Sequence, residues 1–267
     1  MLLASSQQHC SNLIWRESAG STNLELIQLA QTQELEHFTV LATANQVAGR
    51  GRSGRSWEAP QDSALAISVF LRPPMGSPAD LGSLSWLPLI GGLAMSQTVR
   101  GLLPEVKNLG VKWPNDVLVN EHKISGLLTE MLPTTNLAVV IGAGINLTQQ
   151  RNELPIPTAT SLELEGWQAP QNLAERFDEV LSSYLFNLDE IYNRFVALGM
   201  NAVASGIRNQ VIDGCITLGR EVRAELPNGE NLHGRAATID DSGRLVLEVN
   251  GQPVPLSAAD IVHLRHN

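Results

Sequence analysis

The first two thirds of the chain alternate short apolar runs with longer helical patterns. Apolar runs of strand length occupy 12–18, 38–44, 64–71, 111–119, 123–130 and 137–141. The segment 83–103 is apolar at most positions, as a buried helix is, and 172–199 repeats apolar residues with a helical period between acidic ones. This part of the chain therefore predicts a sheet of mostly buried strands that is covered by helices.

The pattern changes after residue 208. Short alternating runs at 215–218, 221–226, 232–239, 245–249 and 261–264 are separated by turns such as Asn228-Gly229, Ser242-Gly243 and Asn250-Gly251. Turns of this kind between alternating strands indicate β-hairpins. We expect a domain of residues 1–208 followed by a small SH3-like β-barrel of residues 209–267.

Charge and cysteine content narrow the class of protein. The net charge is -9 and the pI is about 5.1, which argues against a nucleic-acid partner, because binding phosphate needs a basic face. The two cysteines, Cys10 and Cys215, are typical of thiols in a reducing compartment. No run approaches the roughly 20 apolar residues that cross a bilayer, and the first residues lack the features of a signal peptide. We expect a cytoplasmic protein without a membrane partner.

One basic loop stands out against this acidic background. Residues 46–57 read Gln-Val-Ala-Gly-Arg-Gly-Arg-Ser-Gly-Arg-Ser-Trp, and three arginines alternate with glycines there. Glycine lets the backbone approach a ligand closely, and guanidinium groups match phosphate or carboxylate oxygens. The loop is suited to holding an anion; the alternatives are a solvated basic loop or a nucleic-acid patch.

Three further segments carry polar groups that could join such a site. In Lys112-Trp113-Pro114-Asn115-Asp116, the proline forces a bend that presents a lysine, an amide and a carboxylate. Such a set suits phosphates and Mg²⁺, although a plain turn with a surface ion pair would look the same. Lys123 begins a strand and could project onto the face of the sheet. The alternative is that it is exposed at the surface, as most lysines are.

Two glycines at alternate positions, Gly142 and Gly144, leave one face of a strand bare, so that the flat ring of a ligand could lie against the backbone there, with Asn146 nearby. Upstream, Ser21-Thr22-Asn23 either caps a helix or contacts a ligand. The polar, proline-containing segment 148–160 is long enough to be a lid.

In this order and spacing, the segments 49–57, 112–116, 123–130 and 142–146 resemble those of the biotin protein ligases, and the match extends over residues 12–267. The resemblance implies an α+β fold: a mixed β-sheet with helices packed on it, like class II synthetases, followed by the small barrel. It also implies activation of biotin by ATP to biotinyl-5′-AMP, then transfer to a lysine of the biotin carboxyl carrier protein of acetyl-CoA carboxylase.

Site residues follow from the same resemblance. Lys123 and Arg52 would be catalytic, and Asp116 would bind Mg²⁺. The residues implied for biotin are Ser21, Thr22, Asn23, Gln46, Arg50, Gly51, Arg52 and Lys123. Those implied for ATP are Arg50, Arg52, Trp57, Lys112, Asn115, Asn146 and Arg265.

The chain departs from the family pattern in two places. Ser53 stands where many members have another arginine, and Ser125 stands where glycine or alanine is usual. Some members carry an N-terminal DNA-binding domain, whereas only about 11 residues precede the first expected strand here, so we expect neither DNA binding nor repression. A lipoate protein ligase and a non-catalytic binding protein are the rival hypotheses, and either a monomer or a homodimer is compatible with the sequence.

Overall fold

A seven-stranded sheet forms the centre of the larger part of the molecule in this computed structural model, which describes residues 1–74, 78–132, 137–257 and 259–264. The strands lie in the order β1, β2, β5, β9, β8, β7, β6. Only β1 and β2 are parallel; every other neighbouring pair is antiparallel, so the sheet is mixed, as expected. Their bounds are β1 Asn12–Arg16, β2 Thr39–Thr43, β5 Ala64–Leu71, β6 Leu109–Lys112, β7 Asp116–Val119, β8 His122–Leu132 and β9 Ala138–Asn146.

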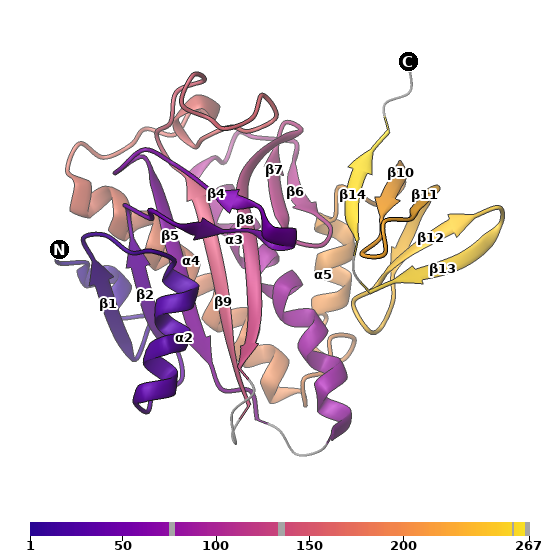
Figure 1. Ribbon diagram of the computed structural model, residues 1–267, viewed down its shortest axis with the longest axis horizontal. Helices are drawn as coiled ribbons and strands as arrows, with labels where there is room; N and C mark the ends of the chain where they lie inside the picture. Colours follow the sequence, from indigo (N-terminus) through magenta and orange to yellow (C-terminus); the bar gives the residue numbers. More distant parts are fainter. Residues whose placement is uncertain (75–77, 133–136, 258, 265–267) are drawn as a thin grey trace.

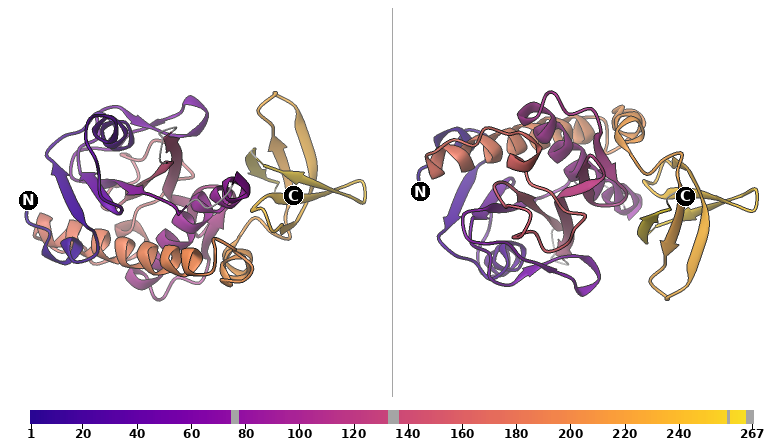
Figure 2. Two further views of the ribbon diagram at one scale, coloured as in Figure 1. Left: turned by 90° about the horizontal axis from the view of Figure 1, so that it is seen from below. Right: turned by 90° about the horizontal axis from the view of Figure 1, so that it is seen from above.

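Helices cover both faces of this sheet. The helices α3 (Leu87–Leu102) and α4 (Leu173–Ala197) pack on one face, and α2 (Thr22–Thr32) packs on the other (Figures 1 and 2). Alternation along β9 separates the two sides, because Val139 and Ile141 belong to the core that includes α3 and α4, whereas Val140 joins the cluster around α2. On the α2 side, β9 continues with Gly142 and Gly144, so this strand has no side chains there.

The remaining short elements connect these layers. They are α1 Ala4–Gln7, β3 Gly49–Arg50, β4 Ser56–Trp57, α5 Ile207–Gly214 and the 3₁₀ turns η1 Arg52–Gly54, η2 Pro78–Trp86 and η3 Glu163–Glu165. The basic loop is thus a tight hairpin, with β3 and β4 paired antiparallel and η1 between them. No helix in the described residues is both long and apolar enough to cross a membrane.

The C-terminal part is a second, antiparallel sheet of five strands in the order β13, β12, β11, β10, β14. The strands are β10 Glu221–Glu225, β11 Asn231–Ile239, β12 Leu245–Val249, β13 Gln252–Leu256 and β14 Asp260–His263. Among the described residues no pairing joins β13 to β14, and the expected small SH3-like barrel is seen here as a five-stranded sheet.

The strand expected at 215–218 is wrong. These residues form turns, and Cys215 makes only a single bridge to Val111 of β6. The backbone N–H of Ile216 donates to the Val111 carbonyl, which covers the free edge of β6. The boundary that we placed after residue 208 falls within α5 and stays a prediction.

Candidate active site

A cavity of about 480 Å³ opens between the N-terminus of α2, the basic hairpin and the bare end of β9. Its wall brings together segments that are far apart in the sequence. Of the residues implied by the resemblance, it contains Ser21, Thr22, Asn23, Gln46, Arg50, Gly51, Arg52, Trp57, Asn115, Asp116, Lys123 and Asn146. Lys112 is half-buried and does not line the cavity, and Arg265 lies outside the described residues.

At one end, a hydrogen-bonded network fixes the start of α2. Ser21 is the N-cap, but its side chain makes no capping hydrogen bond, which favours the ligand interpretation of this cluster. The Thr22 backbone N–H donates to Gln46 Oε1 at 2.9 Å, and the Ser68 hydroxyl lies 2.8 Å from Thr22 Oγ1 and 2.6 Å from Asn23 Oδ1. This end therefore offers buried, preorganised hydroxyl and amide groups.

The bare face of β9 is covered by protein side chains. A β-carbon at position 142 would lie 2.2 Å from Asn23 Oδ1, and one at position 144 would lie 2.5 Å from the Trp57 indole. We expected a flat ligand ring against this backbone, but Asn23 occupies the place at Gly142 and the Trp57 indole the place at Gly144. The two glycines allow Asn23 and Trp57 to pack directly on the backbone, where they form adjacent parts of the cavity wall.

A β-bulge aims Lys123 into the cavity. Ser125 pairs with Val117 and Lys123 pairs with Leu118, so Ile124 is an extra residue on β8. If all these residues paired regularly, Lys123 would face the side opposite to Gly126, because the two are three positions apart and side chains alternate along a strand. Instead, the Lys123 Nζ atom lies 2.9 Å from the position that a Gly126 β-carbon would take. Nζ also forms an ion pair with Asp116 Oδ1 at 2.7 Å.

Asn115 connects the basic hairpin to β8. Arg52 Nη1 donates to Asn115 Oδ1 at 3.0 Å, while Asn115 Nδ2 donates to the Leu127 carbonyl at 2.8 Å. We expected Asn115 to contact phosphates, but both ends of its amide are engaged with the protein. Its observed contacts hold the Arg52 guanidinium at the edge of the cavity.

The segment 148–160 forms a third wall and is tied down at several points. Asn146 Nδ2 donates to the Thr160 carbonyl at 2.8 Å, and the buried Gln149 donates to Asn146 Oδ1 at 3.0 Å. The Thr160 N–H also donates to the Lys123 carbonyl at 2.8 Å, and Ile156 lines the cavity. The expected lid is thus anchored beside Lys123 in this structure.

The cavity is positively charged although the chain is acidic. Its lining contains the cationic side chains Arg50, Arg52, Arg55 and Lys123 and the acidic side chains Glu58 and Asp116. Burial lowers the pKa of nearby Lys112, and the negative charge of Asp116 opposes this shift. Arg55 forms an ion pair at 2.8 Å with Asp260 of β14, which joins the basic hairpin to the C-terminal sheet.

The residues present suit a loosely held Mg²⁺ ion. The described residues contain no cluster of three or more His, Cys, Asp or Glu side chains that could enclose a metal. Mg²⁺ in nucleotide sites usually takes one or two carboxylates and completes its shell with phosphate oxygens and water. Asp116, with one oxygen paired to Lys123, is the carboxylate that fits this role.

The sequence reasoning missed three residues that shape the site. Ser68 is the only polar residue in the run 64–71, and that exception was a usable signal. Glu130 accepts a hydrogen bond from Asn23 Nδ2 at 2.8 Å, and Arg55 lines the cavity beyond Arg52. Arg55 is the third arginine of the basic loop, and Glu130 ends the segment 123–130, but the family resemblance assigns neither residue a role of its own.

Comparisons with known proteins agree with this site. The Biotin/lipoate A/B protein ligase family matches residues 17–146, and the biotin protein ligase C-terminal domain matches residues 217–264. A biotin–[acetyl-CoA-carboxylase] ligase from Mycobacterium tuberculosis is 36% identical, over 94% of this chain and 90% of that protein. A bifunctional ligase/repressor from Bacillus subtilis is 30% identical, over 94% of this chain and 73% of that protein.

One solved structure of a similar protein contains bound ligands. The biotin protein ligase from Aquifex aeolicus, in complex with biotin and ATP, superposes with a TM-score of 0.72 at 25% identity. The match covers 96% of this chain and 99% of that chain. With the sheet, the cavity and both family matches along one polypeptide, the chain belongs to the biotin protein ligase family.

Proposed function

We propose that this chain joins biotin and ATP to form biotinyl-5′-AMP and pyrophosphate, then transfers the biotinyl group to a lysine of a biotin carboxyl carrier protein. The observation that carries the proposal is the single cavity whose wall brings Lys123 and Arg52 together with a hydroxyl- and amide-lined end and the Trp57 indole. A ureido ring needs the first end, and an adenine ring can stack on the second.

In this arrangement, Ser21, Thr22, Asn23 and Gln46 bind the biotin rings, and Arg50 and Gly51 line the valeryl chain. Trp57 and Asn146 face the adenine. Lys123 and Arg52 lie where the biotin carboxylate meets the α-phosphate. Because the Asn115 amide is engaged with Arg52 and Leu127, we assign it a positioning role rather than a phosphate contact.

Charge neutralisation is the main requirement of the first step. Two unit negative charges about 4 Å apart repel by about 4 kcal/mol at an effective dielectric of about 20. Lys123 and Arg52 offset this repulsion while a carboxylate oxygen attacks the α-phosphorus and the bond to pyrophosphate breaks. Mg²⁺ bound through Asp116 and the phosphates would supply further positive charge.

In the second step, a neutral lysine amine of the carrier attacks the acyl carbon of the mixed anhydride. The C–N bond forms, AMP leaves with the electrons of the C–O bond, and the amine loses a proton. Arg52 holds the phosphate of the adenylate until the carrier arrives, and the Asn115 bond keeps Arg52 in place.

A labelling assay separates biotin from lipoate as the substrate. The match of residues 217–264 to the C-terminal domain of biotin protein ligases favours biotin. Incubation with ATP, Mg²⁺, a carrier domain and either acid should label the carrier with biotin alone. Lipoyl transfer in place of biotinyl transfer would reject the assignment.

Replacing Lys123 with alanine separates an enzyme from a binding protein. Removing one preorganised cation from a developing negative charge typically costs about 10²- to 10³-fold in kcat, so pyrophosphate release should fall by that order. The exposed Lys107 provides a matched control, and Lys107→Ala should leave the rate unchanged. Normal turnover by Lys123→Ala would remove Lys123 from the chemistry.

We also propose that the protein acts in the cytoplasm and does not bind DNA. The net charge of -9 and the free thiols Cys10 and Cys215 support this. A gel-shift titration with duplex DNA in about 50 mM salt, with and without biotin and ATP, tests the second point. Retarded DNA at low protein concentration would contradict it.

A further inference from the structure

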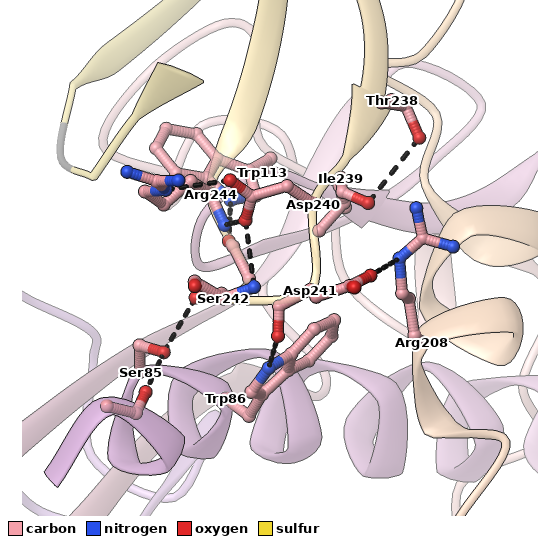
Figure 3. Close-up of polar contacts among 12 residues, drawn as sticks. Ser85, Trp86, Trp113, Arg208, Thr238, Ile239, Asp240, Asp241, Ser242 and Arg244 are labelled. Atoms are coloured by element: carbon pink, nitrogen blue, oxygen red, sulfur yellow. Dashed lines mark hydrogen bonds and ion pairs between the residues drawn. The ribbon is translucent and has the colours of Figure 1, made fainter. Parts of the chain in front are cut away.

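A turn of the C-terminal sheet packs into the larger domain beside the cavity. This interdomain turn, residues 240–244, connects β11 to β12 and is shown in Figure 3. The Trp86 indole N–H donates to the Asp241 carbonyl at 3.0 Å, and the Trp113 indole N–H donates to the Gly243 carbonyl at 3.2 Å. Both tryptophans are buried, with exposed fractions of 1% and 2%. Two similar hydrogen bonds therefore hold one turn.

Trp113 differs from Trp86 in the segment of chain that follows it. It is followed by Pro114, Asn115 and Asp116, the bend between β6 and β7. The Trp113 backbone N–H donates to Thr217 Oγ1 at 3.1 Å, and Thr217 also belongs to the C-terminal part. The residue that begins the bend is therefore held at two points by groups outside the larger sheet.

The bend in turn holds both cations that the proposed chemistry needs. Asn115 accepts a hydrogen bond from Arg52 at 3.0 Å, and Asp116 pairs with Lys123 at 2.7 Å. A shift of the bend would displace both partners together. By contrast, the residues at the biotin-ring end, such as Thr22 and Gln46, are fixed by bonds to each other and to β5.

We propose that Trp113 is a positioning residue: its bonds to Gly243 and Thr217 let the C-terminal domain set the places of Arg52 and Lys123. This inference rests on the proposed function only for its effect on kcat. The positioning of Arg52 and Lys123 by Trp113 can be tested in a protein that is not turning over substrate. The alternative is that Trp113, like Trp86, contributes only to the stability of the domain junction.

Trp113→Phe and Trp86→Phe form a matched pair for the test. Each removes one indole N–H bond to the same turn and keeps a buried aromatic ring. A hydrogen bond of this kind contributes roughly 0.5–1.5 kcal/mol, so Trp113→Phe should lower kcat for adenylate formation about three- to tenfold. The KM for biotin should stay unchanged. Trp86→Phe should keep kcat within about twofold of the wild-type value, even if its Tm falls as much as that of Trp113→Phe.

Thr217 provides a second pair. Thr217→Val removes the acceptor for the Trp113 N–H and should lower kcat, whereas Thr217→Ser keeps a hydroxyl and should restore it. Equal kcat values in both tryptophan variants, or in Thr217→Val and Thr217→Ser, would overturn the proposal in favour of a purely structural junction.

Hydrogen exchange of the free protein gives a readout that is independent of activity. The amides of Gly51 and Arg55, which donate to the carbonyls of Arg55 and Arg52, should exchange faster in Trp113→Phe than in Trp86→Phe, because Arg52 loses a well-placed Asn115. Identical exchange in the two variants would refute the positioning role. A wild-type protein that forms no adenylate would refute the proposed function instead, and the exchange comparison would still decide the role of Trp113.

Discussion

At the scale of single residues, Gly142 and Gly144 decide which side chains can lie on the inner face of β9. Gly142 admits Asn23 at the end assigned to biotin, and Gly144 admits the Trp57 indole at the end assigned to adenine. Both backbones are extended, so alanine is tolerated by the strand itself and acts only through the added methyl group.

Alanine at either glycine should therefore affect one substrate selectively. Overpacking costs typically 1–3 kcal/mol, which corresponds to a roughly tenfold or greater rise in KM. Gly144→Ala should raise the KM for ATP, and Gly142→Ala should raise the KM for biotin. Each variant serves as the control for the other in steady-state pyrophosphate-release kinetics. Equal effects on both substrates would contradict the assignment of the two ends.

Twelve of the fourteen residues selected from the sequence line the cavity, but the sequence could not tell how their side chains bond. Lys123, Arg52 and Trp57 line one cavity. Asn115 and Asn146 line it too, yet their amides bond to Arg52, Leu127, Thr160 and Gln149. An amide looks the same in a sequence whether it meets a ligand or a neighbouring carbonyl, and only the folded backbone decides between these partners.

At the scale of elements, long buried strands and helices were predictable and irregular ones were not. The strand β5 has the bounds expected from its apolar run, Ala64–Leu71. The strand β13 was missed because Pro253 and Pro255 interrupt its pattern. Both are exposed, and they lie at alternate positions of an edge strand, where their missing N–H groups face away from β12.

The anchored segment 148–160 yields a prediction at the same scale. Asn146→Ala removes the bonds to Thr160 and Gln149 and should free this wall. Trypsin cleavage after the exposed Arg151 should become about tenfold faster for each 1.4 kcal/mol of lost anchoring, and the KM for ATP should rise. Asn187→Ala, which removes a bond to Thr98 on the opposite side of the sheet, is the control. Unchanged cleavage would show that Asn146 does not anchor the segment.

At the scale of the whole molecule, the two sheets share one hydrophobic core and one polar network. The core cluster includes Trp86 and Leu89 of the larger domain together with Ile239 and Leu245 of the C-terminal sheet. This sharing follows from contacts between residues over 100 positions apart. Local patterns contain no such information, which is why two groups of strands could be anticipated while the junction between the two sheets could not.

His263 lies in this junction and makes it sensitive to acid. Its Nε2 lies 3.2 Å from Thr217 Oγ1, and its Nδ1 lies 3.4 Å from Arg220, which pairs with Glu121 at 2.6 Å. Burial, followed by the positive charges of Lys112 and Arg220, lowers the pKa of His263 to about 4, and Glu121 opposes this shift. A guanidinium only donates, so the neutral ring accepts at Nδ1 and donates from Nε2.

Stability should therefore fall as the pH drops from about 6.5 towards 4. In that window the unfolded chain binds a proton at residue 263 that the folded chain excludes. Above about pH 6.5 both states are neutral and the contribution vanishes. Urea midpoints at pH 7 and pH 5 should differ more for the wild type than for His263→Gln. The exposed His233 is the control, and a His263→Gln profile equal to that of wild type would contradict this role.

The bulge at Ile124 decides which face of the sheet Lys123 points to, because it lets two residues three positions apart, Lys123 and Gly126, share one face. Deleting Ile124 would remove the bulge but leave Lys123 opposite Leu118, two residues from Gly126 in a regular strand, so the ammonium group would stay on the same face. The same three residues, 123–125, paired in regular register would turn the amine to the opposite layer, so protein engineers could re-site it by straightening the strand pairing at Ile124 rather than by shortening the chain.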